Sequence, residues 1–154
     1  MELRILGIAA SVALLTGWSG PAAPARQSVK YTAQMNGATE MPPNTEKATG
    51  TATLTLAGNQ LRYTITVQGL SGPATAAHIH LGKVGVAGPP VYTFTVKNIA
   101  AGTLAEGSID LTKDVSKGVS GDSLKVLLNN GNAYVNVHTA AHGAGEIRGQ
   151  VAKQ

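Results

Sequence analysis

Apolar and polar residues alternate at a period of two along most of this chain, with turn-forming residues between the runs. Ala57-Gly58-Asn59-Gln60 joins two such runs, residues 52–56 and 61–67, as a hairpin. Only residues 123–128 suggest a helical turn. The pattern therefore predicts an all-β chain with seven or eight strands, folded as an antiparallel β-sandwich or a Greek-key β-barrel. The remaining strands are expected at residues 29–35, 76–81, 91–96, 107–111, 133–139 and 146–151.

The first 25 residues have the pattern of a secretory signal peptide. Arg4 precedes an apolar run over residues 5–15, and the segment ends in Ala23-Pro24-Ala25. An uncleaved membrane anchor is disfavoured, because the run is shorter than the ~20 residues that span a bilayer. We expect a signal over 1–25 and one domain over 26–154, in the periplasm or outside the cell, without membrane contact after cleavage.

Composition excludes several classes of function. The 154 residues include no cysteine, so disulfides and thiolate metal sites are excluded. The formal net charge of +4 comes from scattered lysines and arginines, which argues against a nucleic-acid partner. No G-x-S-x-G elbow, phosphate loop or recognisable carboxylate pair is present, so nucleophilic, glycosidic and phosphate-loop chemistry lack candidate residues.

The four histidines occur in two short clusters, H-x-H at His78 and His80 and H-x-x-x-H at His138 and His142. Residues i and i+2 of a strand face the same side. If the aliphatic residues of these strands face the core, the polar ones lie on the outer face of the sheet. That set is His78, His80, His138, Glu146 and Arg148.

This grouping predicts a metal site rather than four unrelated surface histidines. Two imidazoles on one strand can share an ion at ~2 Å each when another strand supplies a third ligand. His138 is the expected third ligand, and His142 is a further candidate on a glycine-rich loop. A nitrogen-only donor set suits copper, with zinc as an alternative, and disfavours calcium and magnesium.

Two charged residues are candidates for supporting roles around this ion. Glu146 could accept a hydrogen bond from an imidazole N–H and fix its tautomer. Arg148 could draw an anionic molecule toward the metal. Alternatively, Arg148 is a surface residue paired to Glu146 or to a neighbouring strand.

The chain resembles the CHRD domain family from about Tyr31 to Val151. The motifs that carry the resemblance are NGATEMPP (36–43), ATGTATLTL (48–56), TAAHIHLGKVGVAGPPV (75–91) and AYVNVHTAAHGAGEIRGQV (133–151). The resemblance implies a secreted β-sandwich, and in chordin-like proteins such modules belong to extracellular binding proteins.

A looser resemblance is to the copper half of Cu/Zn superoxide dismutases, which are Greek-key barrels. It implies that His78, His80 and His138 are copper ligands and that Arg148 guides superoxide. The metal-bridging histidine of that family would fall at Pro90, and its zinc ligands and disulfide have no counterpart here. The implied site is therefore copper-only, completed by His142 or water.

Three functions follow as hypotheses. The first is a copper-binding protein with dismutase-like redox activity toward superoxide. The second is a copper carrier or buffer without catalysis. The third is an extracellular protein-interaction module that binds no metal.

Overall fold

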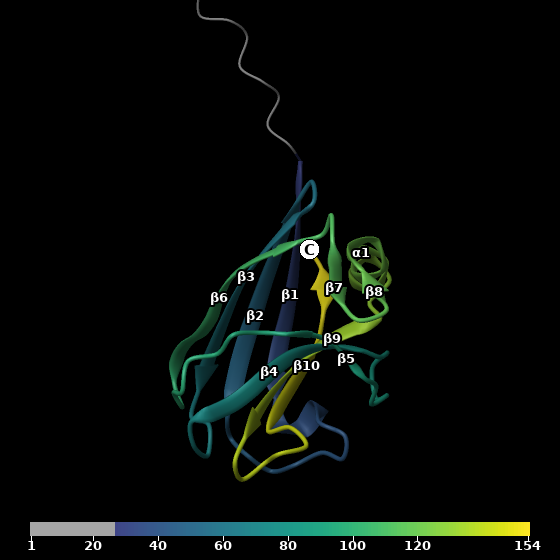
Figure 1. The fold of residues 1–154 in the computed structure, drawn as a ribbon. Coiled ribbons are helices and arrows are strands. Elements are labelled where there is room, and N and C mark those ends of the chain that lie inside the picture. The colour runs from purple at the N-terminus through teal and green to yellow at the C-terminus, as the bar shows by residue number, and fades with distance from the viewer. Residues whose placement is uncertain (1–26) are drawn as a thin grey trace, which may run out of the picture.

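The computed structural model describes residues 27–154, and the expected signal peptide lies outside them. These residues form eleven strands, one α-helix and one 3-10 helix (Figure 1). In chain order they are β1 (Ser28–Asn36), η1 (Gly37–Thr39), β2 (Thr49–Ala57), β3 (Gln60–Gln68), β4 (Ala74–Leu81), β5 (Pro90–Thr93), β6 (Gly102–Asp110), β7 (Asp114–Ser116), β8 (Val119–Ser120), α1 (Gly121–Asn129), β9 (Ala133–Thr139), β10 (Ile147–Gln150) and β11 (Ala152–Lys153).

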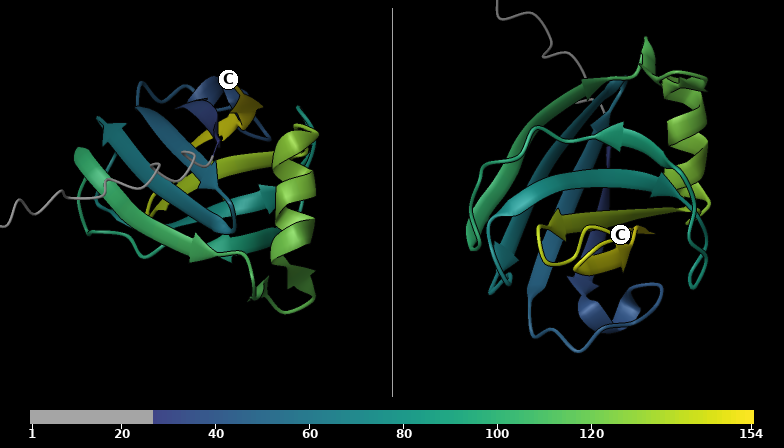
Figure 2. Two further views of the ribbon diagram at one scale, coloured as in Figure 1. Left: turned by 90° about the horizontal axis from the view of Figure 1, so that it is seen from above. Right: turned by 60° about the horizontal axis from the view of Figure 1, so that its bottom comes forward.

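One antiparallel sheet contains most of the strands, in the order β5-β4-β9-β10-β1-β2-β3-β6, with β11 paired to β1. The sheet curls strongly, so its two halves face each other across a single core (Figures 1 and 2). The prediction of an all-β antiparallel fold is confirmed. Its form is a half-barrel made from one continuous sheet.

The segment after β5 spans the gap between the two ends of this sheet. The Phe94 amide donates to the Ala77 carbonyl on β4, and the Lys97 amide donates to the Leu104 carbonyl on β6. This segment occupies residues that were expected to extend a strand to Val96, whereas β5 ends at Thr93. It links both ends of the curled sheet without adding a regular strand.

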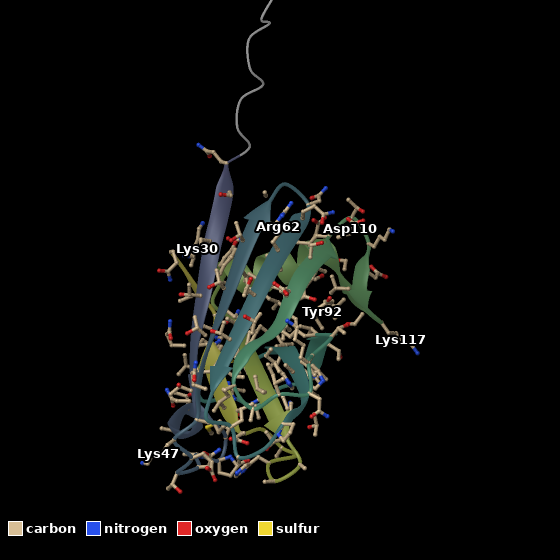
Figure 3. The ribbon with its side chains drawn as sticks, turned by 90° about the vertical axis from the view of Figure 1, so that its left-hand side faces the viewer. Lys30, Lys47, Arg62, Tyr92, Asp110 and Lys117 are labelled. Atoms are coloured by element: carbon tan, nitrogen blue, oxygen red, sulfur yellow. The ribbon has the colours of Figure 1, made fainter. Side chains whose placement is uncertain are left out.

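Alternation sets the core as expected in the first half of the sheet. In β3 every second residue is buried and the others are exposed. The exposed residues form an open polar face, on which Lys30 and Arg62 stand clear of the sheet (Figure 3). The turn before β3 uses Gly58 at φ 60°, the positive φ that a two-residue hairpin loop requires at its first position.

The second half of the sheet departs from this pattern. In β9 six of the seven residues are buried, on both faces. The segments that cover its outer face include residues 37–46 and 82–88, whose hydrogen bonds reach β9 and β10. The prediction of an open outer face here is wrong, because alternation within a strand cannot tell whether a distant loop lies over it.

Helix α1 confirms the expected helical turn at 123–128 and extends it at both ends. The Ser120 side chain accepts a hydrogen bond from the Ser123 amide as N-cap, while Leu124 and Leu128 are buried in the core. Within residues 27–154, no helix has the length and apolar character needed to cross a membrane.

Candidate metal centre

Three of the four histidines meet on the covered face of the sheet. His78 and His80 project from β4 and His138 from β9, and one ring nitrogen of each lies within 4.8 Å of the other two. The strands bring them together because His78 pairs with Asn136 and His80 with Tyr134, so His138 is the next outward-facing position along β9. The predicted convergence of these three imidazoles is present in the structure.

The closest contact joins His78 Nδ1 and His138 Nε2 at 3.0 Å. Two nitrogens bound at about 2.0 Å to one tetrahedral ion lie about 3.3 Å apart, so this spacing needs little adjustment. The rings of His78 and His138 meet edge to face, at 4.9 Å between centroids. The nitrogens of His78 and His138 therefore face each other, and the two rings do not stack.

Backbone carbonyls fix the orientation of two of the rings. His80 Nδ1 lies 2.8 Å from the Gly88 oxygen, and His138 Nδ1 lies 3.1 Å from the Gly143 oxygen. Since a carbonyl only accepts, each neutral ring carries its proton on Nδ1 and its lone pair on Nε2. Metal-binding histidines are typically held through the other ring nitrogen in this manner.

The same surroundings keep the imidazoles neutral. Burial, with the neighbouring His138 and His80, lowers the pKa of His78 to about 4. Burial also lowers the pKa of His80 and of His138, although their hydrogen bonds to Gly88 and Gly143 oppose the shift. Neutral imidazole is the form that binds a metal. With the His138 lone pair on Nε2, the 3.0 Å contact is donated by the His78 Nδ1–H, so an ion between these two atoms requires the His78 proton to lie on its other nitrogen.

The Nε2 atom of His80 is buried and has no hydrogen-bond partner. Such atoms are uncommon in folded proteins because desolvation without a partner costs about 1–3 kcal/mol. An ion bound at this nitrogen would supply the missing partner. The donor set, the tautomers of His80 and His138 and this unpaired atom fit a metal ion held by nitrogen ligands.

Strand alternation predicted that Arg148 lies exposed beside the histidines. The structure shows that it is buried. Its side chain is 3% exposed, and Nη2 donates to the carbonyl oxygens of Lys83 and Val86 at 3.2 and 2.8 Å. The guanidinium carbon lies 3.4 Å from the centroid of the Tyr134 ring. The covering segment 82–88 thus encloses the arginine, which pairs with neither Glu146 nor open solvent.

Tyr134 separates this arginine from the histidines. Its ring stacks on His80 with centroids 4.8 Å apart and planes inclined by 14°. Because β9 lies between β4 and β10, His80 and Arg148 approach the ring from opposite sides. Tyr134 is not among the predicted site residues, although its position in β9 places it on the same side of the strand as His138.

The expected role of Glu146 as an imidazole partner is wrong. Its carboxylate accepts hydrogen bonds from the Ser71 amide and hydroxyl and from the Thr139 hydroxyl, at 2.6–2.7 Å. Burial alone would raise its pKa, but these hydrogen bonds outweigh burial and lower the pKa. Glu146 does not follow the alternation of Arg148, because β10 begins at Ile147, one residue later.

His142 lies outside the three-histidine group. Its Nε2 is 3.1 Å from Oε1 of Glu46, on the segment that covers the sheet. This contact ties the loop 140–146 to residues 40–46. The same loop presents the Gly143 carbonyl to His138, so His142 is placed to support the segment that orients His138.

Glu40 is a buried residue near the site that sequence analysis did not select. It is 5% exposed, and Asn136 Nδ2 donates to its Oε1 at 2.5 Å. Burial raises the pKa of Glu40 to about 7, against the lowering effect of Arg148 and its hydrogen bonds. The available signal was the NGATEMPP motif, which contains Glu40.

Residues 31–151 match the family model of the CHRD domain, which covers most of the chain. Comparison with curated proteins and with solved structures gave no match. The family match agrees with the extent of the sheet, whose paired strands run from β1 to β11.

Proposed function

Because the chain belongs to the CHRD domain family, whose domains occur in extracellular or secreted proteins, we propose that it is a secreted copper-binding protein. Its location would be the periplasm or the extracellular space. The copper ligands would be His78, His80 and His138.

The convergence of three neutral imidazoles from two strands carries this proposal. Two of the rings have Nε2 lone pairs set by carbonyl partners, and one of these nitrogens is buried without a partner. No thiolate can contribute because the chain has no cysteine. A nitrogen-only set of this kind suits copper, while zinc is the nearest competitor.

The burial of Arg148 favours a carrier or buffer over a dismutase. Guidance of superoxide requires a positive charge that reaches solvent near the metal. Here the guanidinium is enclosed by the Lys83 and Val86 carbonyls and the Tyr134 ring. Copper binding without turnover is therefore the function that we propose.

Metal titration of the purified, metal-free protein tests this proposal. We expect one copper ion per chain, bound more tightly than zinc. His78→Ala, His80→Ala and His138→Ala should each raise the Kd at least about 100-fold, because each removes a ligand. Lys30→Ala, on the open face, is the control and should leave the Kd unchanged.

Two outcomes would redirect the functional assignment. Equal binding in the wild type and all three histidine variants would remove the metal site and leave the protein-interaction module. Copper-dependent superoxide decay by the wild type, above that of free copper, would restore the dismutase hypothesis.

A further inference from the structure

We infer that the three-histidine site holds copper as Cu(I), and that Arg148 is the residue that biases the site against Cu(II). This inference rests on the proposed function, since it concerns the oxidation state of the same ion. The donor set, the fixed position of the guanidinium and the partial burial of the donors carry it.

The donor set offers no negative charge to the ion. Among the described residues the group consists of three imidazoles, with no carboxylate. The site would therefore have a charge of about +1 with Cu(I) and +2 with Cu(II), and the higher charge is costlier in a partly desolvated place. Cu(II) also prefers square-planar or tetragonal coordination, which three ligands do not complete.

Arg148 adds a fixed positive charge behind one ligand. Its guanidinium lies on one face of the Tyr134 ring, and His80 stacks on the other. Arginine stays protonated at any physiological pH, and at 3% exposure solvent screens it little. The Lys83 and Val86 carbonyls hold Nη2, so the charge cannot turn away from the site.

Two buried acidic residues could offset this charge, but neither does so fully. The Glu146 carboxylate is directed at Ser71 and Thr139, away from the histidines. Glu40 interacts electrostatically with Arg148, but burial raises its pKa to about 7, so near neutral pH it is only partly ionised. A net positive environment remains on the Tyr134 side of the site.

Coulomb's law gives the size of the bias. The guanidinium carbon lies 3.4 Å and the His80 ring 4.8 Å from the Tyr134 centroid, which puts the charge on the order of 8 Å from the ligand ring. At that separation and an effective dielectric of about 20, the second charge of Cu(II) changes the affinity ratio roughly tenfold to thirtyfold. A tenfold change corresponds to about 59 mV in the potential of a one-electron couple. The effect is large enough to measure and small enough to leave Cu(I) binding intact.

Competition titrations with a Cu(I) chelator under anaerobic reducing conditions, and with a Cu(II) chelator in air, test the inference. In the wild type we expect the Kd for Cu(I) to be at least roughly tenfold below that for Cu(II). Arg148→Gln should tighten Cu(II) binding about tenfold relative to Cu(I), and Arg148→Lys should not. Circular dichroism identifies variants that do not fold.

The outcomes separate this inference from the proposed function. Failure of the wild type to bind copper in either state would overturn both. Copper binding with a lower Kd for Cu(II) than for Cu(I) would overturn only the inference, even if the arginine variants do not fold. An unchanged affinity ratio in folded Arg148→Gln would remove the role of Arg148.

Discussion

The side chain of Glu40 is a carboxyl group that is almost fully buried from solvent. Burial raises its pKa from 4.5 to about 7, so the folded protein keeps this proton at pH values where the unfolded chain has lost it. Since the folded state then binds more protons at this residue, the contribution of Glu40 to the free energy of unfolding falls as pH rises between these two values. The effect belongs to one residue and should disappear with it.

We predict that Glu40→Gln removes this pH dependence. From pH 5 to 7.5, the free energy of unfolding of the wild type should fall relative to that of the variant, by at most about 3 kcal/mol. Glutamine keeps the carbonyl that accepts from Asn136, so the packing is retained. Urea unfolding across the pH range measures the difference, with the exposed Glu106→Gln as control. Parallel curves for wild type and Glu40→Gln would contradict the raised pKa.

The positions of some site residues could be predicted from the sequence, and those of others could not. His78, His80 and His138 could be grouped because strand parity alone puts them on one side of adjacent strands. Arg148 has the same parity, but its burial depends on the segment 82–88, which lies more than 60 residues away in the chain. Long-range covering of this kind leaves no periodic signal in the sequence.

Among the elements around the site, the loop 140–146 contacts a histidine of the group directly. Its Gly143 carbonyl orients His138, and its His142 contacts Glu46 on a neighbouring segment. Gly145 sits at φ 132°, where an added Cβ would approach Asn136 Nδ2 to 2.5 Å. The loop is therefore held by contacts at His142 and Gly143 and is closely packed at Gly145.

We predict that His142 acts through this loop and does not bind the metal. His142→Ala should raise the copper Kd about tenfold, well below the loss from removing a ligand. Glu46→Ala should cause a similar loss, and the double variant should lose no more than either single change. His142→Gln, which retains a donor for Glu46, should bind nearly as the wild type does. A loss in His142→Ala equal to that in His138→Ala would make His142 a ligand.

Regular strands were the elements best predicted. The expected strand at 133–139 matches β9 at both ends, and the hairpin turn at Gly58-Asn59 is present. β6 begins at Gly102, five residues before the expected start, because Ala105 and Gly107 leave its alternation weak. The short strands β7, β8 and β11 have too few residues to produce a period.

At the scale of the whole molecule, folding depends on the core and on the polar network around the site, because no disulfide can form. The three histidines join β4 to β9 within the covered half of the sheet. An ion bound to the folded state alone adds to the free energy of unfolding in proportion to the logarithm of its concentration over the Kd.

We predict that copper raises the melting temperature of the whole domain. At a free-ion concentration 100 times the Kd, the gain is about 2.7 kcal/mol. For a domain of this size, that corresponds to a shift on the order of 10 °C. Calorimetry under anaerobic reducing conditions, with and without metal, measures the shift. The same addition to His138→Ala should leave its melting temperature nearly unchanged, whereas an equal rise would indicate binding elsewhere.

The segment after β5, which is hydrogen-bonded to β4 and to β6, affects how readily two copies of the protein associate. An uncovered edge strand offers free amides and carbonyls to a second chain, and this is a common route to fibrous aggregates. Phe94 and Lys97 occupy part of that backbone at opposite ends of the sheet. Neighbouring copies thus find fewer places to add a strand, which favours a protein that remains dispersed when crowded.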